Sequence, residues 1–135
     1  MKNSSKLNID LNSKNNTRDG NPGAYNLRSI SDGWTAFHFT CFFGHSDIAE
    51  MIMKNSSQLK IDLNSKDSDG WTAFHFACMS GHIRIVDMMI ELSESLELDL
   101  KAEDKHGRTG YKLAKEFRKT DVVNLIRTKM PCLAM

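Results

Sequence analysis

Apolar side chains in segment 83–90 fall on one side of an α-helix. Four of them are three, three and one residues apart, as on a helix that buries a single stripe. Charged residues fill the other sides. The pattern predicts an amphipathic helix from about His82 to Ser95. The stripe consists of Ile83, Val86, Met89 and Ile90, and the charged residues are Arg84, Asp87, Glu91 and Glu94.

A shorter apolar segment runs from Thr35 to Gly44. Threonine is a common N-cap because its hydroxyl accepts a hydrogen bond from a free N–H group of the first turn. Glycine often ends a helix because it adopts positive φ without strain. We therefore predict a short helix between these two residues, and a second one that ends at Gly81. The apolar residues of the first are Phe37, Phe39, Thr40 and Phe43.

The segment from Leu59 to Gly70 has a different pattern. Leu59, Ile61 and Leu63 alternate with polar residues, and the segment then reaches Asp-Ser-Asp-Gly. Alternation followed by turn-forming residues is typical of a hairpin. We predict a projecting hairpin after each helix pair.

The chain repeats itself at an offset of 37 residues. The sequence DGWTAFHF occupies residues 32–39 and recurs unchanged at residues 69–76. A more diverged third copy begins at Gly107. A single helix pair cannot bury its own apolar stripe, so neighbouring copies must stack on each other. The repeat therefore predicts an all-α solenoid of stacked helix-turn-helix units.

A second internal match has a different offset. Residues 1–14 repeat residues 53–66 at 12 of 14 positions, which is an offset of 52. The excess of 15 residues indicates that segment 15–30, rich in Asn, Gly, Pro and Arg, is an inserted loop at a junction where the next copy has only Asp67 and Ser68. Met53 lies at the end of a predicted helix, so residues 1–14 are interpreted as the tail of a truncated upstream repeat.

The order Asp-Gly-x-Thr-x-apolar-His, followed by Ala-Cys-x-x-Gly-His-x-x-Ile-Val, resembles the ankyrin repeat. The resemblance covers roughly residues 31–130. It implies an ankyrin-repeat solenoid with projecting β-hairpin loops, divided into repeats at 31–66 and 67–103, a C-terminal capping repeat at 104–130, and a tail at 131–135.

The sequence departs from the ankyrin pattern in three ways. Ala36 and Ala73 replace the proline of the first helical turn, and alanine keeps good helix propensity. Each unit is about four residues longer than is typical, which predicts one extra turn on the second helix. In the third unit Lys112 replaces histidine and residues 118–119 replace Gly-His, as expected of a polar capping unit.

One constellation of residues has the types that bind zinc. His38, Cys41 and His45 recur 37 residues later, and histidine and cysteine three apart share a helix face. In the ankyrin pattern, however, the first histidine bonds the threonine three residues before it and the second ties neighbouring loops. We favour these structural roles and expect no metal. Cys41 and Cys78 are accordingly expected to be inert thiols in the core.

The sequence has no signs of catalytic or cofactor chemistry. It contains no GxxxxGK[ST], HExxH or GxSxG motif. We expect no enzymatic activity and no cofactor. The alternative to a stand-alone adaptor is a regulatory or targeting segment of a longer enzyme or ion channel.

Composition and charge narrow the class of partner. The 135 residues have a formal net charge of +1, which is too small to attract nucleic acid or an anionic membrane. No apolar stretch is long enough to span a bilayer. Three cysteines without a CxxC pair fit free thiols in a reducing compartment, so we expect a cytoplasmic or nuclear protein.

The resemblance to ankyrin repeats implies non-catalytic binding of a partner protein in a concave groove. It also implies a monomer, if upstream repeats cap the stack. The groove would be lined by hairpin tips and by the exposed side of each first helix. We expect Phe42→Ala to weaken binding and to leave the melting temperature nearly unchanged. The candidate partner-binding residues are Ser31, Asp32, Trp34, Phe42, Phe43, Ser68, Asp69, Trp71, Met79, Ser80, Lys105, His106 and Arg108, and Glu116 and Phe117 occupy the matching positions of the third unit.

Overall fold

Three helix pairs form the protein in the computed structural model, which describes residues 33–134. The first helices of the pairs are α2 (Ala36–Phe43), α5 (Ala73–Ser80) and α7 (Gly110–Glu116). The second helices are α3 (Ser46–Lys54), α6 (Ile83–Leu92) and α8 (Thr120–Lys129). A short helix, α4 (Ser56–Leu59), follows α3, and a 3-10 turn, η3 (Pro131–Ala134), follows α8.

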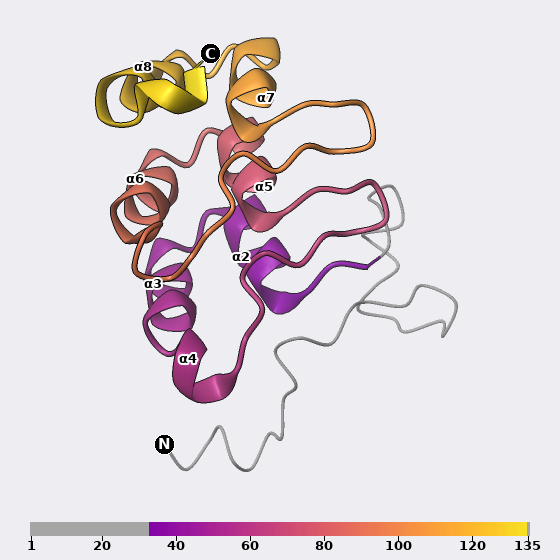
Figure 1. Ribbon diagram of the computed structural model, residues 1–135, viewed down its shortest axis with the longest axis vertical. Coiled ribbons are helices and arrows are strands. Elements are labelled where there is room, and N and C mark those ends of the chain that lie inside the picture. Colours follow the sequence, from indigo (N-terminus) through magenta and orange to yellow (C-terminus); the bar gives the residue numbers. More distant parts are fainter. Residues whose placement is uncertain (1–32, 135) are drawn as a thin grey trace.

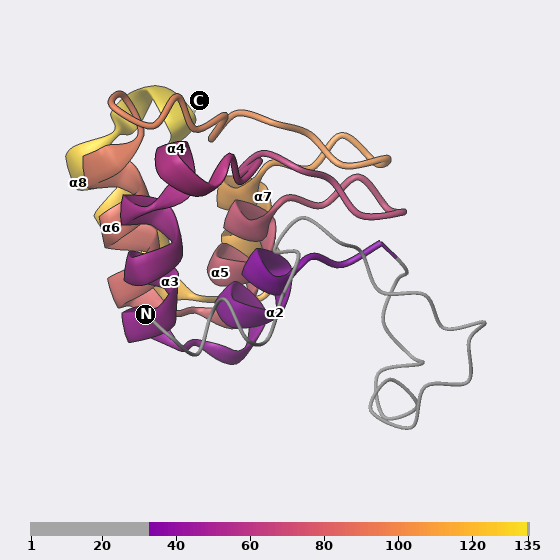
Figure 2. The ribbon, with the colours of Figure 1, turned by 90° about the horizontal axis from the view of Figure 1, so that it is seen from below.

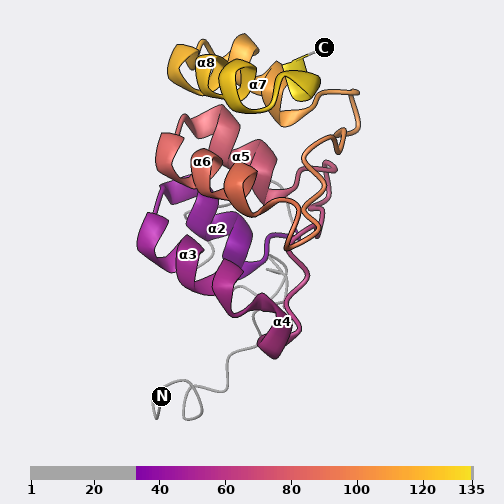
Figure 3. The same cartoon turned by 60° about the vertical axis from the view of Figure 1, so that its left-hand side comes forward.

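The helix pairs stack in two columns. Helices α2, α5 and α7 contact one another in sequence order, and α3, α6 and α8 form the second column (Figure 1). Each pair makes one layer of the stack (Figure 3). Of the apolar stripe predicted on α6, Val86, Met89 and Ile90 are buried, but Ile83 is 36% exposed, and Ile85, which the prediction left out, is fully buried. The described part of the chain has no β-strand, so the predicted all-α solenoid is confirmed.

The first helix of each pair begins and ends as its sequence predicts. Thr35 Oγ1 accepts a hydrogen bond from His38 N, and His38 Nδ1 accepts one from Thr35 N at 2.8 Å. Thr72 and His75 form the same capping box on α5. Gly44 ends α2 with φ of 80°, a conformation that glycine adopts without the clash a Cβ would introduce.

Long hairpin loops join one helix pair to the next and project on the same side of the stack (Figure 2). In the first, Asp67 N donates to Trp71 O at 2.9 Å and Gly70 N donates to Asp67 O at 3.0 Å. Asp104, Gly107 and Arg108 repeat this pattern in the second hairpin. The predicted hairpins are therefore present, as turns closed by backbone hydrogen bonds.

The predicted extra turn does not continue the second helix. Helix α3 stops at Lys54, and α4 is a separate turn whose last cap, Lys60, has a φ of 55°. The Ser56 hydroxyl donates to the Met53 carbonyl at 2.8 Å, and Ser93 does the same to Ile90 at 2.9 Å. Serine hydroxyls that bond nearby carbonyls compete with helix continuation, which explains the break.

The C-terminal residues are also part of the stack. Segment 131–135 was expected to be a tail, but η3 packs against α8 and buries Leu133. Leu133 lies 37 residues after Leu96 and 74 after Leu59, so η3 occupies the repeat position of the turn after each second helix. The third unit therefore carries the same extension as the first two.

Some expectations concern residues outside the described range. These are the repeat tail at 1–14, the inserted loop at 15–30, and the candidate contacts Ser31 and Asp32. The proposed repeat boundaries stay predictions.

Candidate functional site

The candidate contact residues come from the first helices and from the hairpins, which share one side of the stack (Figures 1 and 2). We use "inner surface" for the described members of the predicted set that remain at least partly exposed. They are Phe42, Phe43, Ser68, Asp69, Trp71, Met79, Ser80, Lys105, His106, Arg108, Glu116 and Phe117.

Trp34 does not belong to this surface. Only 1% of its area is exposed, and its ring lies 4.4 Å from that of Phe76 in the next unit and 4.8 Å from that of Phe39. Trp34 therefore lies in the core of the stack and not on the surface where the sequence placed it, packed on Phe76 of the next unit and on Phe39 of its own. Its ring contacts that of Phe42, so Trp34 is part of the buried packing behind the inner surface.

Phe76 is the centre of an aromatic cluster that the sequence did not single out. Its ring contacts those of Trp34, Trp71 at 5.0 Å and Phe42 at 6.0 Å. Phe39 holds the same repeat position one unit earlier. Both belong to the repeated DGWTAFHF sequence, and an aromatic residue after the histidine was the available signal.

Phe43 is the most accessible aromatic group at this site, with 50% of its area exposed. Phe42 is half-buried and contacts the rings of Trp34, Phe43 and Phe76. Since Phe42 is part of the packed cluster, Phe42→Ala is now expected to lower stability, in contrast to the expectation from sequence. Met79 and Ser80, at the matching positions of the second unit, are half-buried.

Asp104 organises the second hairpin and joins it to the preceding unit. Its Oδ1 accepts from the backbone N–H groups of His106 and Arg108, each at 2.8 Å. Its Oδ2 accepts from Trp71 Nε1 at 3.0 Å and from Arg108 Nε at 2.9 Å. The carboxylate therefore fixes the orientation of Trp71. Asp67, 37 residues earlier, likewise accepts from two backbone N–H groups, and this spacing was the signal for both residues.

The surroundings of Asp104 favour its ionised form. Burial raises the pKa of the carboxyl group, but the N–H groups of Arg108 and His106 and the Arg108 guanidinium together lower that pKa below its ordinary value. Asp104 is consequently an anion in the fold near neutral pH.

The Arg108 guanidinium is held by the same network. It lies 5.8 Å from the centre of the Trp71 ring and pairs with Glu116, Nη1 to Oε2, at 3.3 Å. A guanidinium fixed by two carboxylates and an aromatic face is a rigid part of the surface. The hairpin tips carry the exposed polar side chains of Asp69, Lys105 and His106.

The repeated histidines and cysteines have structural roles. His38 Nδ1 bonds Thr35, and His38 Nε2 lies 2.9 Å from the carbonyl oxygen of Ser65 in the next hairpin. His82 Nε2 lies 2.8 Å from Phe42 O in the preceding unit. Both roles expected from the ankyrin pattern are confirmed.

The two cysteines of the helices are buried thiols. Burial raises the pKa of Cys41 and of Cys78 far above the ordinary thiol value. A thiol with a raised pKa is a poor nucleophile and a poor metal ligand. Nowhere in the described part of the chain do three His, Cys, Asp or Glu side chains gather closely enough to hold a metal ion.

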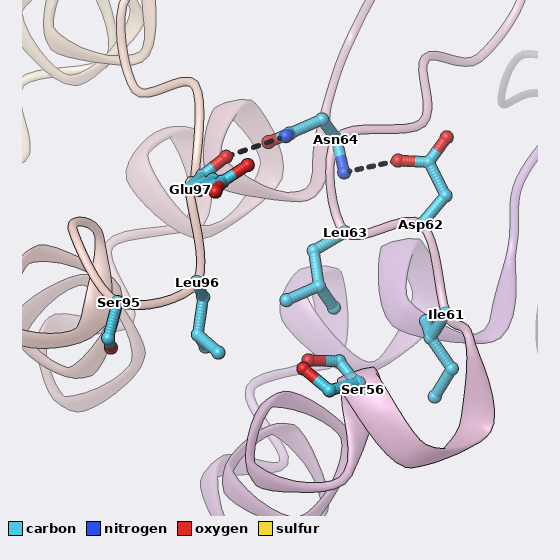
Figure 4. A pocket seen from close by; sticks show the side chains of 9 residues that line it. Ser56, Ile61, Asp62, Leu63, Asn64, Ser95, Leu96 and Glu97 are labelled. Atoms are coloured by element: carbon cyan, nitrogen blue, oxygen red, sulfur yellow. Dashed lines mark hydrogen bonds between the residues drawn. The ribbon is translucent and has the colours of Figure 1, made fainter.

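A hollow of about 320 Å³ lies away from the inner surface, between the extension turns of the first two units (Figure 4). Asn64 spans the two units there, because its side-chain amide donates to Glu97 O at 3.0 Å and accepts from Asp99 N at 2.8 Å. These two side-chain bonds of Asn64 join one hairpin to the next. The lining residues include Ser56, Ile61, Leu63 and Leu96.

Every helix within residues 33–134 is too short or too polar to cross a membrane.

Comparisons with known proteins agree with the geometry. A family model described as "Ankyrin repeats (3 copies)" matches residues 6–104 and 57–130. Among solved structures, a chain from the crystal structure of the yeast ribosomal protein Rps3 in complex with its chaperone Yar1 is similar, with 25% identity and a TM-score of 0.64. The match covers 73% of this chain and 68% of that one. No curated protein matches the chain significantly.

Proposed function

Because this chain belongs to the ankyrin repeat family, we propose that it is a non-catalytic adaptor that binds a partner protein through its inner surface. Ankyrin repeats are protein-protein interaction modules and are generally non-catalytic. The similar yeast structure is itself a complex between two proteins, which supports a protein as the class of partner.

The observation that carries the proposal is the half-exposed position of Phe43 on a rigid aromatic support. Phe42 holds the Phe43 ring at 4.9 Å, and Phe42 in turn rests on the buried cluster around Phe76. Aromatic side chains that are already ordered lose little conformational entropy on binding and are common at the energetic centres of interfaces. The exposed polar hairpin tips would supply the rim.

Specificity in this proposal comes from the charges at the hairpin tips. Asp69 and Lys105 belong to adjacent hairpins, which the hydrogen bond from Lys105 N to Asp69 O holds together at 3.1 Å. An acidic and a basic group are thereby presented side by side at fixed spacing. Ser68 and His106 extend this row of exposed polar residues.

The experiment compares capture by the full chain with capture by two variants that each shorten one exposed apolar side chain to alanine. Phe43→Ala removes an aromatic group of the inner surface that is 50% exposed, and Met51→Ala removes a side chain of α3 that is 59% exposed and lies outside it. A true partner is retained by the wild type and by Met51→Ala. We expect Phe43→Ala to weaken its Kd roughly tenfold or more, since truncation of an interface anchor costs about 1–2 kcal/mol.

Equal binding of the purified partner to both variants, or selective loss with Met51→Ala, would refute the inner surface as the binding site. Equal thermal stability of the two variants establishes that the difference arises in binding.

We further propose a cytoplasmic or nuclear location, which is supported by the three cysteines being free thiols.

A further inference from the structure

Charge is distributed unevenly between the units of the stack. Residues 105–134, which include the helix pair α7 and α8 at the top of Figure 3, contain eight Lys or Arg and two Asp or Glu. Residues 33–104 contain five Lys or Arg and twelve Asp or Glu. The formal charge of +1 for the whole chain therefore results from an acidic pair of units and a basic third unit.

Two lysines of α7 occupy positions that face the following unit elsewhere in the stack. Lys112 lies 37 residues after His75, whose Nε2 lies 2.8 Å from a carbonyl oxygen of the following hairpin. Lys115 lies 37 residues after Cys78, which is fully buried, and a Cβ at Gly110 of α7 would lie 3.0 Å from the Cys78 Sγ. Both lysines are exposed.

Two arginines continue the same surface. Arg118 has the position of Gly81, where a Cβ would touch a side chain of the following unit. Arg127 has the position of Ile90, which is buried, and its Nε donates to Tyr111 Oη at 3.0 Å. Both arginines are exposed. We use "cap surface" for Lys112, Lys115, Arg118 and Arg127.

The cations of the cap surface have no acidic partner. None of them forms an ion pair with an Asp or Glu within residues 33–134. Other cations of the chain are paired, as Lys54 is with Glu50 and Lys129 is with Asp87. The cap surface thus differs from the rest of the stack in charge and in pairing.

The two acidic residues of the basic region do not neutralise the cap surface. Glu116 pairs with Arg108 on the inner surface, Oε2 to Nη1, at 3.3 Å. Asp121 has a position that is exposed in every unit, because Asp47 and Arg84 are exposed as well. That position is therefore not one that a following unit covers.

Solubility alone does not account for four cations on one end of the stack. A surface in water needs polar residues, and charges of both signs meet that need. Like charges on neighbouring positions repel each other, and an anionic partner would relieve this repulsion. A further repeat on the cap surface would instead bury these charges without partners, which is disfavoured.

We propose that the cap surface binds a short acidic segment of a partner protein, whose carboxylates pair with these cations. Lys112 and Lys115 are three residues apart on α7, which places their Cβ atoms about 5–6 Å apart. Alternate side chains of an extended peptide recur about every 7 Å on one face, so successive carboxylates can reach both lysines.

The charge of the other units favours a short segment over a larger polyanion. Nucleic acid or an anionic membrane would extend beyond the third unit and meet the acidic first and second units, which would repel it. A few acidic residues can lie wholly within the cap surface.

The test measures binding of the full chain to a labelled ten-residue peptide of alternating Glu and Ser, by fluorescence anisotropy in 0.1 M salt. A peptide with Gln in place of Glu is the uncharged control, and we expect it to bind at least tenfold more weakly. Lys112→Gln combined with Lys115→Gln should weaken the Kd for the Glu peptide about fivefold, since each surface ion pair changes a Kd by up to about fivefold.

The matched control is Lys54→Gln combined with Lys60→Gln. It removes two exposed lysines of the first unit and changes the net charge equally. Its Kd should change less than twofold, because salt at this concentration screens charges more than about 10 Å apart. Lys112→Arg combined with Lys115→Arg keeps the charge and should bind as the wild type does. All three variants alter exposed side chains, so their melting temperatures should stay within about 2 °C of the wild type.

Four outcomes would overturn the proposal. The first is equal binding of the Glu and Gln peptides by the wild type, and the second is equal weakening in the two glutamine variants. The third is tighter binding to a 20-nucleotide oligouridylate or to phosphatidylserine vesicles than to the peptide, because the partner is then of another class. The fourth is that light scattering shows salt-sensitive oligomers that the Lys112→Gln and Lys115→Gln variant abolishes, because the partner is then a second copy.

The cap surface and the inner surface are tested separately. Phe43→Ala should leave the Kd for the Glu peptide unchanged, because Phe43 belongs to the first unit. A failed capture experiment at the inner surface therefore leaves this proposal standing, and failure of the peptide to bind leaves the proposed adaptor function standing.

Discussion

Asp104→Asn tests whether one carboxylate both shapes the second hairpin and fastens it to the preceding unit. Asparagine keeps one acceptor oxygen, which can still serve the backbone N–H groups of His106 and Arg108. Its NH₂ group then takes the place of Oδ2, where it meets two donors, Trp71 Nε1 and Arg108 Nε. The substitution therefore removes the Trp71 bond between units and the Arg108 side-chain bond, and it retains the two backbone bonds within the hairpin.

The expected loss follows from the bonds that are removed. The indole bond contributes about 1 kcal/mol, and the bond from a charged group contributes about 1.5 kcal/mol where the guanidinium stays partly hydrated. We therefore expect Asp104→Asn to lower the free energy of unfolding by about 2–3 kcal/mol. Asp104→Ala loses the two backbone bonds as well, and about 4–5 kcal/mol is expected.

Urea unfolding followed by circular dichroism measures both values. The matched control is Asp99→Asn, an exposed hairpin aspartate whose side chain, among residues 33–134, accepts only from Lys101 N at 3.2 Å. Its effect should stay within about 0.5 kcal/mol. Trp71→Phe combined with Asp104→Asn should be less destabilising than the sum of the two changes, because both remove the same bond. Additive effects, or equal losses for the asparagine and the control, would refute the reasoning.

The contribution of Asp104 should also depend on pH. Its pKa is lower in the fold than in the unfolded chain, so the unfolded chain binds more protons at acid pH and stability rises with pH there. The stabilisation is present above the ordinary pKa of 3.8 and is lost as pH falls through the folded value. The difference between wild type and Asp104→Asn should therefore shrink below about pH 4.

Three further changes test the fold. Arg118 adopts a φ of 59° where earlier units have glycine, so Arg118→Gly should raise the free energy of unfolding by about 1 kcal/mol in urea titration. Gly44→Ala would place a Cβ 2.5 Å from the His82 ring and should lower the free energy of unfolding by about 2–3 kcal/mol. Gly107 has a φ of 76° and open space around it, so Gly107→Ala should lower it by only about 1 kcal/mol. Equal losses for the two variants would contradict a steric cause. Burial lowers the pKa of His75 despite its bond to Arg108 O, so His75 binds a proton more readily in the unfolded chain than in the fold. The melting temperature should therefore fall as pH drops below about 6.5, and His75→Gln should flatten this dependence on pH. An unchanged dependence would show that His75 is not its source.

The helix ends could be predicted from sequence because they depend on local chemistry. Thr35 and Gly44 act on the backbone within four residues, and the structure has both caps where the sequence placed them. The break after α3 is also local, but it depends on a hydrogen bond from the Ser56 hydroxyl to the Met53 carbonyl. The spacing of apolar residues does not predict that bond.

Exposure of the repeated tryptophans could not be predicted from their own positions. Trp34 and Trp71 occupy identical octapeptides, yet the first is buried and the second is half-buried. Trp34 packs on Phe76 of the following unit, whereas the matching neighbour of Trp71 is the smaller Leu113. The burial of Trp34 thus involves a residue 42 positions away in the chain, and that contact can be known only after the units are stacked.

The two capping boxes, Thr35 with His38 and Thr72 with His75, have a consequence for refolding. Since they lie in identical sequences with matching local geometry, a newly collapsing chain has two interchangeable starting points and can dock either one in the first layer. Residues outside the octapeptide, such as Thr40 and Phe42 against Ala77 and Met79, distinguish the correct arrangement from one shifted by a whole unit. Correcting such a shift requires undocking a complete layer, so a slow kinetic phase is expected from this symmetry alone.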